Sequence, residues 1–242
     1  MSNPQPLFYK NVAPINKEHH GELCIEPAEG FEFANQSSSL YIAAIEFPQA
    51  SREYPIVFGQ DANDVVFPAV LLGLKPNQNL YVGEKGKWDA SYIPAYARRY
   101  PFILARGSGA SEDQFMVCID EGYSGFNTAK EGKPLFNQKG EETELLTQAV
   151  DFLKDYQNHV QLTTRFCENL VKLDLLESMT ANINMNSGEK LSIGGFNCIS
   201  REKLKALKPA KLADLVKTDQ LELIYSHLYS LRNVNGLMEK VK

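Results

Sequence analysis

The sequence lacks the segments that place a protein in or across a membrane. No stretch approaches the ~18 consecutive apolar residues that a spanning helix needs. Residues 1–14 contain no charged stretch followed by an apolar run, so a secretory signal peptide is not expected. The chain has four cysteines, far apart at positions 24, 118, 167 and 198, which is typical of a reduced protein and not of a disulfide framework. We therefore expect a cytoplasmic protein.

A strong excess of charge of either sign is also lacking. Residues 1–140 carry 16 acidic and 12 basic side chains, residues 141–242 carry 14 and 13, and the net charge is -5. Proteins that bind nucleic acid usually present a strongly basic face. No nucleic-acid partner is expected, and an anionic membrane surface is disfavoured for the same reason.

Familiar catalytic and cofactor-binding motifs are missing as well. The glycines of GSGAS (107–111) fit neither the phosphate-loop nor the dinucleotide spacing, and GYSGF (122–126) lacks the spacing of a serine nucleophile turn. DANDVV (61–66) has carboxylates at a calcium-like spacing, without the glycine and distal glutamate that complete such a loop. No cofactor is expected.

Aromatic residues are abundant, and 19 of the 25 lie in residues 1–140. Short runs rich in Val, Ile, Tyr and Phe alternate there with Pro, Gly and Asn, a pattern that predicts strands separated by turns. The predicted strands are 40–47, 54–58, 67–74, 79–83, 100–105 and 115–120, with short helices at 47–53 and 93–99.

Residues 141–242 have a helical pattern instead. Residues 141–177 contain neither Pro nor Gly, and their apolar side chains recur every three or four positions. This predicts one long helix, or two helices with a break near Asn158–His159. Residues 181–185 and 191–196 alternate apolar and polar, as in a hairpin with one buried face. Three more helices are predicted, one capped by Ser200, one opened by Pro209 and one over 221–233.

The predicted fold class is therefore α+β. Residues 1–140 form an aromatic-rich, β-rich region with short helical connectors, and residues 141–242 form a helical region that contains a β-hairpin. Either the two regions are separate domains, or they form one integrated domain.

The strongest candidate site is the stretch KWDASYIPAYARRYPFIL, residues 87–104. Arginine binds carboxylate or phosphate with a planar fork and stacks on aromatic rings, so this combination could hold an acidic or aromatic ligand. The alternative is that the rings fill a core while the arginines extend outward. The candidate ligand- or partner-binding residues are Trp88, Tyr92, Tyr96, Arg98 and Arg99.

A second candidate site lies near the start of the sequence. His19 and His20 stand beside Glu22, with Cys24 two residues further on, and imidazole and carboxylate are common metal ligands and acid–base groups. Adjacent residues of an extended chain point to opposite faces, and no HxH or HxxxH spacing is present. The sequence therefore favours an exposed turn, and no metal is assigned.

Several segments together resemble one family of bacterial proteins, the SapC family. They are EFPQASREYPIVF (46–58), LLGLKPNQNLYV (71–82), GKWDASYIPAYARRYPFIL (86–104) and GGFNCISREKLKALKPAKLADL (194–215). The resemblance implies a link to the bacterial surface layer from which the family takes its name. It implies no reaction and supplies no catalytic residues.

These observations favour a non-catalytic accessory protein that binds a protein, a peptide or a small acidic ligand through its aromatic and arginine residues. One alternative is an enzyme whose site is assembled in space from His19, His20 and Glu22. The other is a surface-layer component that reaches the cell surface without a signal peptide.

Overall fold

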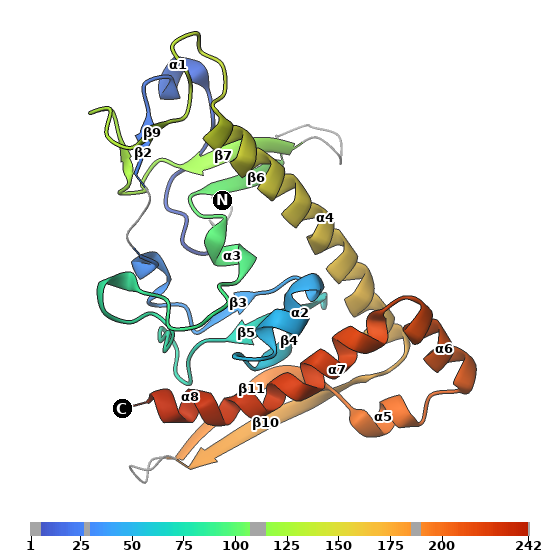
Figure 1. Cartoon of the computed structure of the whole chain (residues 1–242). Helices are drawn as coiled ribbons and strands as arrows, with labels where there is room; N and C mark the ends of the chain where they lie inside the picture. The colour runs from blue at the N-terminus through green and yellow to red at the C-terminus, as the bar shows by residue number, and fades with distance from the viewer. Residues whose placement is uncertain (1–5, 27–29, 107–114, 185–189, 242) are drawn as a thin grey trace.

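The protein has a mixed α+β fold built from three antiparallel sheets and a set of helices, seen in a computed structural model (Figure 1). The structure describes residues 6–26, 30–106, 115–184 and 190–241. The predicted α+β class is confirmed. The glycine-rich segment 107–111 lies outside the described residues, as does the tip of the predicted hairpin.

The largest sheet has five strands in the order β10-β11-β4-β5-β3. Its strands are β3 (Ser39–Tyr41), β4 (Ile56–Gln60), β5 (Val66–Leu71), β10 (Leu176–Asn184) and β11 (Lys190–Ile199). The strands β10 and β11 form the hairpin that the sequence predicts. Phe58 of β4 pairs with Asn197 of β11, so the sheet combines strands from residues 1–140 and 141–242.

Two smaller sheets lie at the other end of the molecule, near the start of the long helix α4 (Figure 1). One has the order β1-β7-β6, from β1 (Val12–Pro14), β7 (Phe115–Asp120) and β6 (Phe102–Arg106). The other has the order β8-β2-β9, from β8 (Phe126–Asn127), β2 (Cys24–Ile25) and β9 (Lys133–Pro134).

The helix α4 (Glu144–Lys172) runs continuously for 29 residues and connects the end with the small sheets to the end that holds α7 (Figure 1). It does not break at Asn158–His159, so of the two predicted alternatives the single helix is correct. The other helices are α1 (Lys17–His20), α2 (Phe47–Ala50), α3 (Ala95–Arg98), α5 (Arg201–Lys205), α6 (Pro209–Lys217), α7 (Gln220–Ser230) and α8 (Val234–Lys240). Four 3-10 turns complete the set: η1 (Glu32–Ala34), η2 (Ala44–Glu46), η3 (Glu84–Gly86) and η4 (Leu231–Asn233).

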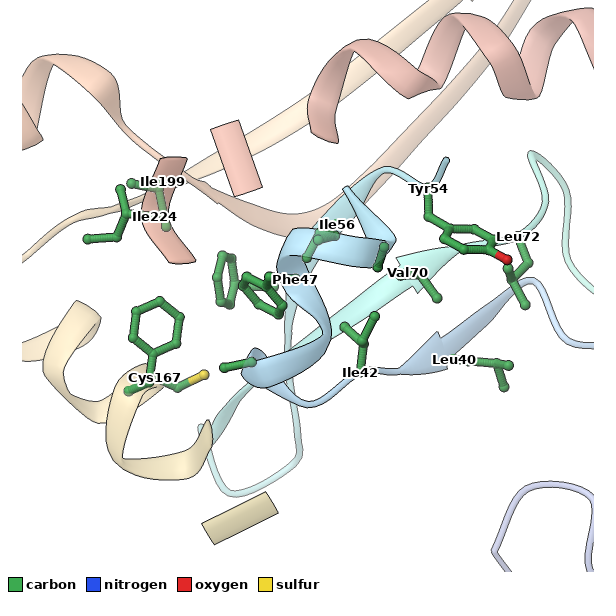
Figure 2. Packing of buried hydrophobic residues seen from close by; sticks show 14 of the residues in the cluster. Leu40, Ile42, Phe47, Tyr54, Ile56, Val70, Leu72, Cys167, Ile199 and Ile224 are labelled. Carbon is green, nitrogen blue, oxygen red and sulfur yellow. The ribbon is translucent and has the colours of Figure 1, made fainter. Parts of the chain in front are cut away.

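The main hydrophobic core lies between the five-stranded sheet, α2, α4 and α7. Figure 2 shows Phe47 and Ile56 packed near Cys167 of α4, with Ile199 of β11 and Ile224 of α7 beside them. Tyr54, Phe47 and Phe58 are fully buried there, and each large aromatic side chain removes a wide apolar area from water. Because residues of both regions fill this core, each region depends on the other for burial.

Two of the predicted strands differ from the structure for local reasons. In 40–47 only Ser39–Tyr41 is a strand, because the Glu46 carboxylate accepts the backbone N–H of Ala43 at 2.8 Å, and residues 44–46 wind into the turn η2. In 79–83 the Asn79 side chain binds the N–H of Tyr81, leaving a single bridge from Val82 to Trp88. Side chains that compete for backbone groups in this way favour turns.

None of the helices in the described ranges has both the length and the apolar character needed to cross a membrane.

Candidate ligand-binding site

A pocket of about 430 Å³ opens between α3, the first half of α4 and the small sheets. Among the described residues, its lining is mostly aromatic and aliphatic, with Arg98 and Arg99 as the charged side chains and no carboxylate. The principal lining residues are Ile25, Phe31, Phe33, Arg98, Arg99, Tyr100, Phe102, Tyr123, Leu145, Gln148, Ala149 and Phe152. Apolar pockets with a few convergent polar groups are the usual form of a ligand site.

Arg99 lies within a cage of tyrosine rings. Its guanidinium carbon is 4.0 Å from the centre of the Tyr96 ring, 5.3 Å from that of Tyr156 and 5.8 Å from that of Tyr9. The Nε atom of Arg99 is buried and has no hydrogen-bond partner. Burial raises the pKa of Tyr9 and of Tyr156, so both phenols stay neutral and supply no counter-charge.

Arg98 is exposed and lies between two aromatic rings, with its guanidinium carbon 5.3 Å from the centre of Phe152 and 5.8 Å from that of Tyr92. Its Nε donates to the carbonyl of Ile93 at 2.9 Å, which fixes the plane of the fork. Among the residues that the structure describes, neither Arg98 nor Arg99 forms an ion pair with a carboxylate.

The buried carboxylate of Glu46 holds the start of α3 in place. It accepts the backbone N–H of Ala95 at 2.7 Å and the hydroxyl of Tyr92 at 2.6 Å, in addition to the N–H of Ala43. Hydrogen bonds to a buried carboxylate are charge-assisted and strong. Glu46 is thus committed to positioning the helix that carries the two arginines.

A second buried carboxylate, Asp120, holds the aromatic wall of the pocket. It accepts the Tyr100 hydroxyl at 3.0 Å and the backbone N–H groups of Lys10, Asn11 and Gly122. Burial alone would raise the pKa of Asp120, but these hydrogen bonds outweigh it and lower the pKa. Tyr100 in turn packs on Phe33, with ring centres 4.4 Å apart.

The five predicted site residues fall into three groups: two line the pocket, two lie against the arginines, and one lies in the core. Arg98 and Arg99 line the pocket, and Tyr92 and Tyr96 lie against their guanidinium groups. Trp88 does not line the pocket: it is 6% exposed, and its indole N–H donates to the Tyr54 hydroxyl at 2.7 Å. Trp88 therefore packs in the core instead of lining the pocket, and its ring lies against Phe31.

The sequence interpretation missed the side chains that close the pocket from other elements. Phe31 and Phe33 come from the turn around η1, Tyr123 follows β7, and Phe152 belongs to α4. The apolar stripe of residues 141–177 predicts that α4 packs on something. It does not say that α4 packs on β5, η2 and β6, or that its Phe152 and Tyr156 meet the arginines of α3, because these contacts depend on the tertiary fold.

The exposed turn expected for the N-terminal candidates is wrong for the histidines, because residues 17–20 form the short helix α1 and His20 packs inward. His20 is buried, its Nδ1 accepts the N–H of Asn16 at 3.0 Å, and its Nε2 lies 3.1 Å from Glu121. His19 and Glu22 are exposed. Within the described ranges, no three His, Cys, Asp or Glu side chains gather closely enough to hold a metal ion.

The four cysteines are free and buried, and Cys24 is one of them. Burial raises the pKa of Cys118, and it raises the pKa of Cys167 and of Cys198 to about 12. A thiolate is the reactive form, so these three thiols have little nucleophilic character near neutral pH.

The two remaining histidines lie on helices. His159 is half-buried on α4, 3.8 Å from Asp155. His227 on α7 is 0% exposed and packs its ring on Phe58.

Comparison with known proteins identifies the family. The SapC family model matches residues 15–237 of the 242-residue chain, and the chain belongs to this family. No curated protein and no solved structure matches the chain.

Proposed function

We propose that this member of the SapC family is a non-catalytic accessory protein that binds the acidic group of a protein, peptide or small ligand in the pocket at Arg98 and Arg99. The observation that carries the proposal is the pair of arginines lining an aromatic pocket to which no carboxylate of the described ranges contributes. Arg99 is half-buried, and a cation partly removed from water without a counter-ion is costly, so a bound anion would offset that cost.

The pocket favours a carboxylate attached to an apolar or aromatic body. The guanidinium of Arg98 offers a planar fork that matches a carboxylate. The rings of Phe31, Phe33 and Phe152 line the remaining space. A body with a flat apolar face would bury against these rings, while a small inorganic anion would leave them in water.

The disposition of the reactive side chains supports a binding role over a catalytic one. Two carboxylates that position the pocket residues, Glu46 and Asp120, are buried and accept three and four hydrogen bonds. Cys118, Cys167 and Cys198 have raised pKa values. The pocket thus offers recognition groups, and its neighbouring acids are occupied in holding the fold.

The proposal is tested with 4-phenylbutyrate and its uncharged amide, which have the same apolar body. We expect the acid to bind in the millimolar range, since ligands of this size gain roughly 0.3 kcal/mol per heavy atom. Saturation-transfer NMR detects such binding. The Arg98→Gln variant is expected to weaken binding of the acid by about tenfold, the usual value of a lost charge-assisted contact.

Arg52→Gln is the matched control, because Arg52 is also exposed but lies outside the pocket. Binding to this variant should equal that of the unmodified protein. Equal affinity for the acid and the amide, or equal loss in the two variants, would contradict the proposal.

A cytoplasmic location is part of the same proposal, and the four free thiols support it. Cell fractionation tests this part. A pool in the soluble cytoplasmic fraction is expected, whereas recovery with the surface layer would favour the surface-associated alternative.

A further inference from the structure

The arginine pocket is the first of three hollows that follow one another along α4. The second, of about 180 Å³, shares Arg98 and Phe152 with the first. The third, of about 640 Å³, shares Ile45 and His159 with the second. Neighbouring hollows share lining residues, so they follow one another along the same side of α4 with the shared side chains between them. We call the three hollows together the α4 groove.

A single stripe of α4 forms one wall of this groove. The stripe consists of Leu145, Gln148, Ala149, Phe152, Asp155, Tyr156, His159, Leu162, Thr163 and Phe166. These residues recur every three or four positions and therefore share one face of the helix. From Leu145 to Phe166 the stripe is about 32 Å long at 1.5 Å per residue.

Two large apolar side chains are left exposed at the far end of the groove. Ile45 of η2 is 59% exposed and Leu162 of α4 is 54% exposed, and both line the third hollow. Exposed apolar side chains that line one hollow mark an interaction surface more often than isolated ones do. We call this pair the apolar shelf.

The charges differ between the two ends of the groove. In the part of the chain that the structure describes, the first hollow has Arg98 and Arg99 and no acid, and the middle hollow adds Glu46 and Asp155. The third has Asp219 and Glu222 at the start of α7, with Arg165 on the α4 side. An occupant that is acidic at one end and has a basic or polar far end would match this distribution.

We propose that the α4 groove binds an extended peptide segment of a partner protein, with an Asp, Glu or C-terminal carboxylate at Arg98 and an apolar side chain on the shelf. This inference rests on the proposed function of the arginine pocket. The occupant is extended because one turn of a helix, about 10 Å across and 5.4 Å long, takes up roughly 400 Å³. The middle hollow has only about 180 Å³.

The geometry sets the spacing between the two anchor residues of the peptide. Phe152, beside Arg98, and Leu162 are ten residues apart on α4, or about 15 Å. An extended chain covers about 3.3 Å per residue. The acidic and apolar anchors of the peptide are therefore separated by about five positions.

The test selects peptides from a phage library of random dodecapeptides on the immobilised protein. The expected consensus has an acidic residue about five positions from Leu, Ile, Met or Phe. A synthetic peptide with this consensus is then titrated by fluorescence anisotropy. Its affinity should fall about tenfold in Arg98→Gln and in Leu162→Lys.

Val171→Lys is the matched control, because Val171 is on the same helix, is 53% exposed and lies outside the groove. It should change the affinity less than twofold. Selection of no consensus, or equal affinity for Leu162→Lys and Val171→Lys, would overturn the inference. Sedimentation of the protein alone should show a monomer; a dimer that Leu162→Lys dissociates would assign the groove to a second copy and also overturn it.

The control with 4-phenylbutyrate separates this inference from the proposed function. If the acid binds through Arg98 but peptide binding does not depend on Leu162, the proposed function is supported and the proposal of a peptide-binding groove is contradicted. If the acid does not bind either, both proposals fail.

Discussion

At the scale of single residues, Arg98 and Arg99 have different roles although they are adjacent. Arg98 is exposed and its guanidinium is open to the pocket, while Arg99 is half-buried among Tyr9, Tyr96 and Tyr156. We therefore propose Arg98 as the recognition residue of the pair. Arg99 contributes both to the pocket and to the packing around it.

This difference predicts unequal effects of alanine substitution on stability. Arg99→Ala should lower the free energy of unfolding by about 1–3 kcal/mol, because the cation–π contacts and the packing of the side-chain stem are lost. Arg98→Ala should change it by less than about 0.5 kcal/mol, as is usual at an exposed position. Urea unfolding of both variants checks this, and equal losses would contradict the assignment.

His227 makes stability depend on pH. Its ring is fully buried, neither ring nitrogen has a hydrogen-bond partner, and burial lowers its pKa to about 3. The unfolded chain takes up this proton near pH 6.5, and the folded chain does not until about pH 3. Its contribution to stability is therefore complete above about pH 6.5 and is lost as the pH falls toward 3.

The expected loss from His227 alone is about 2 kcal/mol between pH 6.5 and pH 5. Urea unfolding at both pH values measures it. His227→Leu removes the titrating group, so its free energy of unfolding should fall by about 2 kcal/mol less between pH 6.5 and pH 5 than that of the unmodified protein. An unchanged loss in this variant would mean that His227 takes up a proton in the folded state.

At the scale of elements, the periodic and turn-rich segments of the sequence were the most informative. Residues 54–58, 67–74, 100–105 and 115–120 contain strands as predicted, and Pro209 opens α6 as predicted. These segments carry their own pattern. Residues 40–47 and 79–83 do not, because Glu46 and Asn79 redirect their backbones through contacts that no local pattern reveals.

The candidate site was predictable only in part for the same reason. The pair Arg98–Arg99 among aromatic residues is visible in the sequence. Its burial partners are not, because Tyr9 and Tyr156 come from distant segments. Trp88 lies close to the two arginines in the sequence, but its side chain belongs to the main core and not to the pocket.

The continuity of α4 gives a prediction at this scale. Asn158 is exposed in the middle of the helix, where a break was one of the two alternatives. Asn158→Pro should therefore destabilise the protein by about 3 kcal/mol or more, while Asn158→Ala should stabilise it by a few tenths. Thermal unfolding monitored by circular dichroism compares them. An unchanged unfolding temperature in Asn158→Pro would indicate that the helix is broken at this position.

At the scale of the whole molecule, the two regions depend on each other. The pairing of β4 with β11 places strands of both regions in one sheet, and the core around Phe47 contains side chains from both. Neither region can bury its apolar face alone, so the molecule is expected to unfold as one cooperative unit.

Two optical signals test this cooperativity. The fluorescence of the single tryptophan, Trp88, reports on residues 1–140, while the helical circular dichroism arises mainly from residues 141–242. The two unfolding curves in urea should coincide. Separate midpoints would show that the regions unfold independently.

The most direct test of the central claim, that Arg98 and Arg99 bind a carboxylate, is NMR of the arginine Nε–H groups. The chain has seven arginines, and the unpartnered Nε of Arg99 makes its signal a sensitive reporter. Adding 4-phenylbutyrate should shift the signals of Arg98 and Arg99 and leave that of Arg52 unchanged, while the amide shifts none of them. Unshifted signals for Arg98 and Arg99, or equal shifts with the amide, would contradict the claim.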